Sequence, residues 1–151
     1  MVNIKELVIK NNISMLETPN VNSNIEVIEI EPNNIVKTAE ILKGNAFDLL
    51  ISITAVDRNP IIEMVYHFYS VKTNQKLVIK ANLSSQNPTI TSLSELYKTA
   101  DWQEREVFDL FGVKFLKHPN LKRILLPQSW IGYPLRKDYE MKDERLIWNE
   151  R

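Results

Sequence analysis

The chain contains no cysteine in 151 residues, and it has only three glycines. The absence of cysteine excludes disulfides, thiolate zinc sites, iron–sulfur ligation and cysteine nucleophiles. Three glycines are too few for the common glycine-rich loops that hold phosphate groups. No apolar run is long enough to span a membrane, and charged side chains interrupt the first ten residues. The sequence therefore predicts neither a membrane-spanning helix nor a signal peptide.

The chain also lacks net charge, because 19 basic residues stand against 19 acidic ones. This balance argues against a protein that binds nucleic acid or an anionic membrane through overall electrostatic attraction. Its length and its hydrophobic content of 44% are typical of one globular domain. We expect a cytosolic protein, or one that is attached to a larger structure from the cytosolic side.

The charges that are present are unevenly distributed. Residues 1–113 hold 10 basic and 14 acidic side chains, whereas residues 114–151 hold 9 basic and 5 acidic ones. Prolines at positions 119, 127 and 134 exclude a long helix or a central strand from the second part. We therefore predict a compact domain over residues 1–112 and an extended tail over residues 113–151.

The compact part is predicted to be α+β, with a small, mostly antiparallel sheet and two or three helices packed on it. Residues 24–30, 47–56, 61–71 and 76–83 are predicted to be strands, because they are rich in β-branched and alternating apolar residues. The last three have short connections, with a hairpin loop over 72–75, which indicates an antiparallel meander. A helical stripe over 35–42 is predicted to end at Gly44.

Two further helices are predicted before the tail. Ser92, with Glu95 three residues later, has the spacing of a capping box for a helix that carries Leu93, Leu96 and Tyr97. Asp101 is placed to cap a helix over 102–111, which Gly112 would end.

The second of these helices and the two histidines hold the candidate chemistry. Arg105 and Asp109 have i, i+4 spacing, and Glu106 and Asp109 have i, i+3 spacing, which favours charge pairing over a metal site or an acid–base pair. His67 lies in an apolar strand and is predicted to pack in the sheet. His118 is the better functional candidate, but one histidine does not make a metal site. Only a metal held by Glu106, Asp109 and His118 would favour an independent enzyme.

The tail combines six basic residues between positions 114 and 137 with large apolar side chains. An extended, proline-interrupted segment cannot bury both its sides on so small a domain, so part of it should lie against another protein. A single-stranded nucleic-acid binding module that uses the basic 114–137 patch is the alternative. The apolar residues of the tail are Leu121, Ile124, Leu125, Leu126, Trp130, Ile131, Leu135 and Tyr139.

Three segments carry a resemblance to a known family: Glu104–Gly112, His118–Leu125 and Trp130–Tyr139. They strongly resemble the C-type subunit of respiratory complex I, in the NADH dehydrogenase 30-kDa subunit family, which includes the J-type subunit of the cyanobacterial and plastid enzyme. The similarity is dense over about 36 residues and looser further upstream. It leaves the electron donor open, because relatives in ferredoxin-linked complexes and membrane-bound hydrogenases share these segments.

The resemblance implies a non-catalytic accessory subunit in the hydrophilic arm of an NADH, NADPH or ferredoxin:quinone oxidoreductase. It would pack on the homologue of the 49-kDa (D-type) subunit near the quinone-reducing module, with B-type and I-type subunits as further partners. No cofactor is expected on this chain, whereas flavin and iron–sulfur clusters are expected on other subunits. The expected location is peripheral, on the cytoplasmic face of an inner membrane of plasma or thylakoid type, with membrane contact only through the complex and no nucleic-acid partner.

The resemblance also implies which residues contact partners or anchor the tail. Trp130 joins them because tryptophan, tyrosine and arginine concentrate at the centres of interfaces. None of these residues is expected to be catalytic or to bind a cofactor or metal. The predicted interface residues are Glu104, Arg105, Glu106, Asp109, His118, Pro119, Arg123, Trp130, Arg136, Lys137 and Asp138.

Overall fold

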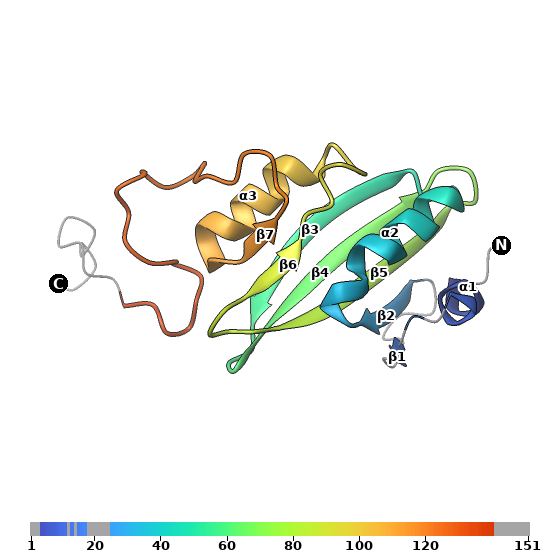
Figure 1. The fold of residues 1–151 in the computed structure, drawn as a ribbon, viewed down its shortest axis with the longest axis horizontal. Helices are drawn as coiled ribbons and strands as arrows, with labels where there is room; N and C mark the ends of the chain where they lie inside the picture. The colour runs from blue at the N-terminus through green and yellow to red at the C-terminus, as the bar shows by residue number, and fades with distance from the viewer. Residues whose placement is uncertain (1–3, 12, 14, 18–24, 141–151) are drawn as a thin grey trace.

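A five-stranded sheet forms the framework of the chain (Figure 1). The computed structural model describes residues 4–11, 13, 15–17 and 25–140. Along the sheet the strands follow the order β1-β2-β5-β4-β3. Their bounds are β1 Met15–Glu17, β2 Glu26–Ile30, β3 Leu49–Asp57, β4 Ile61–Ser70 and β5 Gln75–Ser84.

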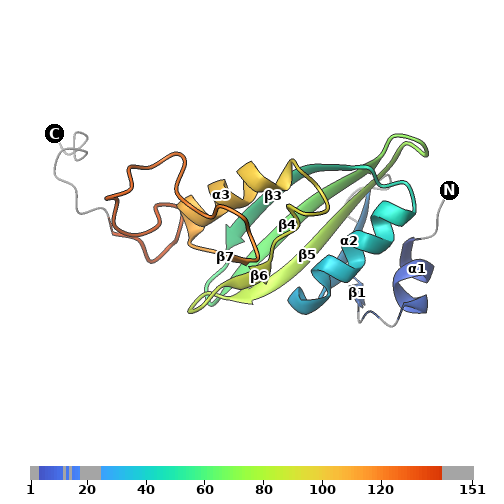
Figure 2. The same ribbon diagram turned by 45° about the horizontal axis from the view of Figure 1, so that its top comes forward.

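Helices α2 (Ile35–Gly44) and α3 (Ala100–Phe111) cover one face of this sheet (Figures 1 and 2). A third helix, α1 (Ile4–Lys10), and a 3-10 turn, η1 (Pro32–Asn34), complete the helical content of the described residues. No helix among them is long and apolar enough to cross a membrane. The core between the layers includes the fully buried side chains Ile28, Ile35, Leu42, Tyr66, Phe68 and Leu77.

The connections explain the strand order. The chain leaves β2, crosses the sheet as α2 and enters at the far edge as β3, and the meander β3-β4-β5 then returns it to β2. The meander is antiparallel, as predicted, and its turn over residues 71–74 confirms the predicted hairpin. Strand β2 pairs with β5 in parallel and with β1 in antiparallel orientation. The predicted α+β fold with a mostly antiparallel sheet is therefore confirmed.

Three local predictions about helices are wrong. Asp101 does not cap α3 but lies in its first turn, because the helix begins at Ala100 with Thr99 as its N-cap residue. Gly44 does not follow α2 as a left-handed residue but belongs to the helix, and Ala46 takes the positive φ of 68°. The segment after Ser92 forms turns instead of a helix, and Glu95 is exposed there. The carboxylate that binds Ser92 comes from Glu104 of α3, which the short-range capping pattern could not reveal.

The chain leaves the compact part through a second, two-stranded sheet. Strand β6 (Thr89–Thr91) pairs in parallel with β7 (Lys114–Leu116), and α3 connects them. Gly112 ends α3 with φ 76°, as predicted. Val113 and Phe115 are buried in the core, so packing continues beyond Gly112, and the division of the chain into two domains there stays a prediction. Residues 117–140 contain neither helix nor strand. The predicted tail over residues 113–151 thus begins with β7, and its residues 141–151 lie outside the described part of the chain.

Candidate partner interface

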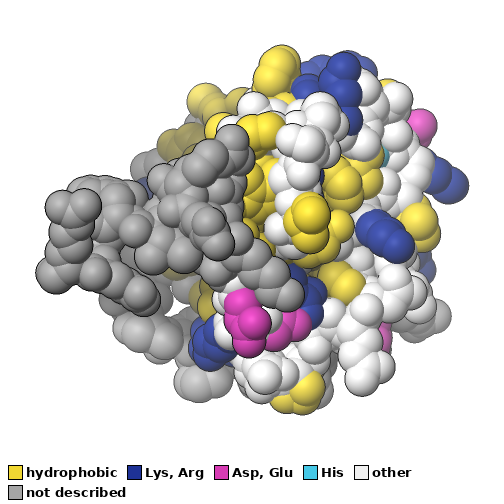
Figure 3. Space-filling model, turned by 90° about the vertical axis from the view of Figure 1, so that its left-hand side faces the viewer, with side chains coloured by type: hydrophobic (Ala, Val, Ile, Leu, Met, Phe, Trp, Pro, Cys, Tyr) yellow, Lys and Arg dark blue, Asp and Glu magenta, His cyan; other side chains and the backbone are white. Residues whose placement is uncertain are grey.

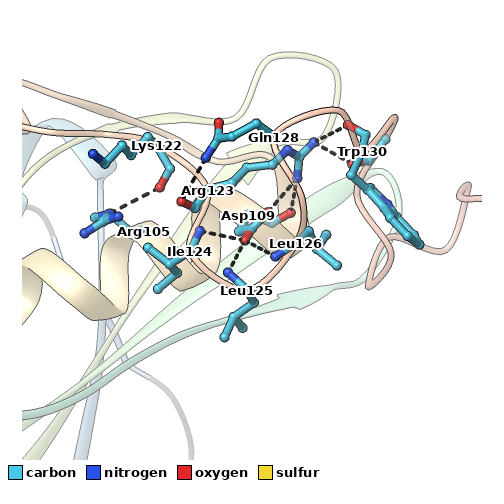
Figure 4. Close-up of polar contacts among 10 residues, drawn as sticks. Arg105, Asp109, Lys122, Arg123, Ile124, Leu125, Leu126, Gln128 and Trp130 are labelled. Carbon is cyan, nitrogen blue, oxygen red and sulfur yellow. Dashed lines mark hydrogen bonds and ion pairs between the residues drawn. The ribbon is translucent and has the colours of Figure 1, made fainter.

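Asp109 on α3 holds the tail by its backbone. Its side chain is fully buried, and one carboxylate oxygen, Oδ2, accepts the N–H groups of Ile124 at 3.0 Å, Leu125 at 2.8 Å and Leu126 at 3.0 Å. The other, Oδ1, lies 2.6 Å from Nη1 of Arg123 (Figure 4). One carboxylate thus satisfies three consecutive backbone donors and one guanidinium.

Arg123 connects Asp109 of α3 to the end of the loop over residues 124–132. Its Nη1 also donates to the Asp109 carbonyl at 2.9 Å, and Nη2 donates to the carbonyls of Trp130 at 3.2 Å and Gly132 at 2.9 Å. The guanidinium carbon lies 5.3 Å from the centre of the Tyr133 ring. Five donors in a planar fork suit arginine to such a junction. Asp109 therefore fixes the start of the loop over residues 124–132, and Arg123, which pairs with Asp109, fixes its end.

These contacts keep Asp109 ionised. Burial acts to raise the pKa of the Asp109 carboxyl, but hydrogen bonds from Leu126, Arg123, Leu125 and Ile124 outweigh it and hold the pKa below its ordinary value. Hydrogen bonds that favour the charged form have this effect. The anchor consequently stays charged throughout the neutral range.

Arg105 and Glu106 do not behave as their spacing to Asp109 predicts. Arg105 donates from Nε to the Lys122 carbonyl at 3.2 Å and lies 4.8 Å from the Trp102 ring centre, so the predicted i, i+4 pair is replaced by a contact with the tail. Glu106 is exposed whereas Asp109 is buried. Within the described ranges, no group of three or more histidine or acidic side chains is arranged to hold a metal ion.

Glu104 lies in an enclosed position on the same helix. Its Oε2 accepts a hydrogen bond from the Ser92 hydroxyl at 2.5 Å, and its Oε1 accepts one from the Leu93 N–H at 2.7 Å. Burial raises the pKa of the Glu104 carboxyl to about 7, although these hydrogen bonds act to lower it and the charge of Asp101 raises it further. Glu104 is therefore a carboxyl group that titrates near neutrality.

His118 brings the first turn of the tail against this carboxyl group. Its side chain has no exposed surface, and its Nε2 lies 3.1 Å from the Asp101 carbonyl and 3.9 Å from Oε2 of Glu104. Its Nδ1 accepts the N–H of Asn120 at 3.0 Å. Pro119, between them, is exposed.

Residues 135–138 of the tail are fastened to the main sheet and to α3. Asp57, the last residue of β3, accepts the N–H of Lys137 at 2.9 Å, and this bond is the main reason that the pKa of Asp57 lies below its ordinary value. Arg136 pairs with Asp138 at 2.9 Å, and Leu135 N–H donates to the Leu110 carbonyl at 3.1 Å. The predicted interface residues did not include Asp57, which lies 80 residues from Lys137.

The tail leaves three of its apolar side chains more than half exposed, whereas Leu121 is partly buried and packs against the core. Apart from the side chain of His118, nothing between positions 116 and 140 of the described chain is fully buried. Leu125 is 60% exposed, Ile131 88% and Leu135 52%. Figure 3 views the molecule from the tail side and shows hydrophobic side chains at this surface with lysine or arginine side chains near them. A groove of about 1270 Å³, lined in part by Trp130, Ile131 and Tyr139, opens beside them.

The eleven predicted interface residues fall into two groups. Buried or partly buried members hold the tail to α3 from within: Glu104, Arg105, Asp109, His118 and Arg123. The others are exposed or half-buried at the surface of the tail or of α3: Glu106, Pro119, Trp130, Arg136, Lys137 and Asp138. Because Arg123 and Arg136 are each engaged by an aspartate, the arrangement of the described tail does not favour the nucleic-acid alternative.

Comparison with known proteins places the chain among subunits of redox complexes. Residues 28–145 match the family model described as respiratory-chain NADH dehydrogenase, 30 Kd subunit. The C-type subunit of NADH-quinone oxidoreductase from Moorella thermoacetica is 47% identical over 107 residues, which cover 70% of this chain and 72% of that one. The chloroplastic J-type subunit of NAD(P)H-quinone oxidoreductase from Pelargonium hortorum is 42% identical over 121 residues, or 76% and 77% of the two chains.

Two solved structures share the fold. A trypsin-resistant fragment of Nqo5 superposes with a TM-score of 0.66 at 19% identity, over 78% of this chain and 96% of the fragment. A chain of the membrane-bound sulfane sulfur reductase, an archaeal respiratory membrane complex, superposes with a TM-score of 0.72 at 24% identity, over 92% and 84% of the two chains.

Proposed function

The chain belongs to the 30-kDa subunit family of respiratory-chain NADH dehydrogenase, and from this premise we propose that it is an accessory, non-catalytic subunit of a quinone oxidoreductase. It packs in the hydrophilic arm on the homologue of the 49-kDa (D-type) subunit, near the quinone-reducing module. Subunits of the B and I types are its further neighbours. The electron donor of the complex is NADH, NADPH or ferredoxin.

The observation that carries this proposal is the exposure of Leu125, Ile131 and Leu135 on a backbone that is firmly held. Covering each of these side chains contributes on the order of 1–2 kcal/mol to association. Since Asp109 and Arg123 already fix the loop, little conformational entropy is lost when a partner covers it. A free flexible tail of the same composition would bind more weakly.

The two groups of interface residues have different roles in this proposal. Asp109, Arg123 and Glu104 act as positioning residues that shape the tail from within. The side chains at the surface, such as Trp130 and Lys137, contact the neighbouring subunits directly. Mutation of the first group changes the shape of the interface, and mutation of the second changes its contacts.

Electron transfer takes place on other subunits, which carry the flavin and the iron–sulfur clusters. This chain has no cysteine, so it cannot supply the thiolates of an iron–sulfur cluster. Its attachment to the membrane is indirect, through the complex, at the cytoplasmic face of an inner membrane of plasma or thylakoid type.

The test is co-purification of the chain with the 49-kDa subunit homologue after Ile131→Asp. A buried aspartate without a partner opposes association, so we expect at least tenfold less bound chain. Val71→Asp is the matched control, because Val71 is also exposed, at 61%, and lies in the turn between β4 and β5. This turn is at the opposite end of the sheet from Asp57, which holds the tail. Unchanged binding of the Ile131 variant would contradict the proposed interface.

A further inference from the structure

Two ionisable side chains with no exposed surface face each other where the tail begins. Glu104 projects from α3, and His118 lies directly after β7, with 3.9 Å between Oε2 and Nε2. Neither contributes to the exposed surface proposed for the partner. Of the described residues, only His118 brings a basic nitrogen within ion-pair distance of the Glu104 carboxyl, and the contact is an ion pair only when the ring is protonated. The contact between Glu104 and His118 thus joins an ionisable side chain of α3 to the first turn of the tail.

The groups around this pair come from each element packed against it. From α3, Asp101 places Oδ1 3.5 Å from Nε2 of His118. From β4, the buried Tyr66 hydroxyl has no hydrogen-bond partner and feels the charge of Glu104. The segment directly after β6 contributes the Ser92 hydroxyl and the Leu93 N–H as donors. Apart from His118, the ionisable side chains around Glu104 are Asp101 and Tyr66, and both become negatively charged when they ionise.

The hydrogen bonds of His118 define which nitrogen carries its proton when the ring is neutral. Nδ1 accepts from Asn120 N–H, so the proton lies on Nε2 and is donated to the Asp101 carbonyl. Ionisation of Glu104 beside a neutral His118 would leave a buried carboxylate close to Asp101 with no full positive charge next to it. Such a charge is costly unless water reaches it.

We infer that Glu104 and His118 form a proton-linked latch, in which loss of the proton held at Glu104 loosens the first turn of the tail, residues 117–122, from α3. Displacement of the His118 ring admits water to the carboxylate and breaks the hydrogen bond between His118 and the Asp101 carbonyl of α3. The tail is held firmly when the proton is present and more loosely when it is absent. The latch is a property of this chain and does not depend on the identity of its partners.

The direction of the pH effect follows from linkage. Burial raises the pKa of Glu104 to about 7 in the folded chain, from an ordinary value of 4.5. A raised carboxyl pKa means that the folded state binds the proton more tightly than the unfolded one. Its contribution to stability is complete below about pH 4.5 and is lost as the pH rises through about 7. The latch should therefore open between about pH 6 and pH 8.

The absence of cysteine allows a clean test with a nitroxide spin label on Lys122→Cys of the full chain. Lys122 is exposed, and its carbonyl is held by Arg105. In the labelled chain without further substitution, the fraction of mobile label in the electron paramagnetic resonance spectrum should at least double between pH 6 and pH 8, with a midpoint near 7. Glu104→Gln keeps the size of the side chain and cannot ionise, so its spectrum should not change with pH.

Glu106→Gln is the matched control, because it makes the same change two residues away at an exposed site. It should retain the transition. Ser92→Ala removes a donor that favours the ionised carboxylate, so its midpoint should rise by about half a pH unit or more. This variant decides the matter if circular dichroism shows that Glu104→Gln does not fold. A transition that persists unchanged in Glu104→Gln, or a native chain without one, would overturn the latch.

Discussion

The compact part and the tail hold themselves together by opposite means. Around the main sheet, apolar side chains such as Tyr66, Phe68 and Leu77 are enclosed. Along the tail, hydrogen bonds of backbone and charged groups, chiefly at Asp109 and Arg123, are added to the packing of Leu121 and Tyr133, while Ile131 stays almost fully exposed. The compact part uses its apolar surface for its own stability.

This difference explains how an extended segment can have a defined shape without a core of its own. Hydrogen bonds to a buried carboxylate are directional and require no apolar contact. They fix the loop over residues 124–132 and leave its apolar side chains available to a neighbour. Mutations in the two regions should therefore have effects of different kinds.

The largest effect on stability is expected in the core. Phe68→Ala removes a side chain that is 1% exposed and packs 5.5 Å, centre to centre, from Tyr97. We expect a loss of about 3–5 kcal/mol in the free energy of unfolding. Chemical denaturation followed by circular dichroism measures it. A loss below about 1 kcal/mol would mean that this core is not the main source of stability.

The next largest effect is expected at the anchor of the tail. Asp109→Ala leaves three backbone donors without their acceptor and removes the carboxylate that pairs with the Arg123 guanidinium. Breaking a buried pair costs about 3 kcal/mol, so hydrogen exchange at the Ile124, Leu125 and Leu126 amides should accelerate roughly 100-fold. Amides of β4 and β5 should change much less.

Asp138→Ala is the control for that experiment. Its side chain is 65% exposed, and it also pairs with an arginine. Because exposed ion pairs contribute little, exchange at residues 124–126 should not change. Equal effects of the two substitutions would remove the distinction between an internal anchor and a surface pair.

A smaller effect is expected at the junction of the two regions. Gly112 has φ 76°, and a Cβ there would lie 2.5 Å from the Tyr133 ring. Gly112→Ala should therefore lower the free energy of unfolding by about 1–2 kcal/mol and disturb the near-ultraviolet signal of tyrosine. Gly44→Ala, with no atom within 4 Å of its Cβ, should instead stabilise α2 by roughly 0.5–1 kcal/mol. Changes of the same sign would contradict this reasoning.

The smallest effect on stability is expected from Ile131→Asp. Ile131 is 88% exposed, so the isolated chain should unfold within about 0.5 kcal/mol of the native chain. Thermal unfolding checks this value. A large loss would show that Ile131 packs within the chain, and its availability to a partner would then be excluded.

Local patterns predicted much of the compact fold. Alternation and a short loop revealed the β4–β5 hairpin, and Gly112 revealed the end of α3. Spacing rules cover only a few residues, so they assigned Arg105 to Asp109 and Glu95 to Ser92, whereas the actual partners are Arg123 and Glu104. The parallel pairing of β2 with β5 also depends on a crossover that no local pattern records.

The site was predictable in composition but not in arrangement. The tail's apolar and basic residues indicated an interface, yet the sequence could not distinguish residues that shape the tail from residues that face outward. That distinction depends on burial, which places Glu104 and Asp109 inside and Lys137 and Ile131 outside. Contacts over long separations, such as Asp57 with Lys137, decide it.

Hydroxyl-radical footprinting of the free chain and of the chain in its complex tests whether a neighbouring subunit covers the apolar side chains of the tail. Oxidation of Leu125, Ile131 and Leu135 should fall severalfold on assembly, while that of the exposed Val71 should not change. Equal oxidation of the three tail residues in both states would show that no neighbour covers them and would contradict the proposed interface.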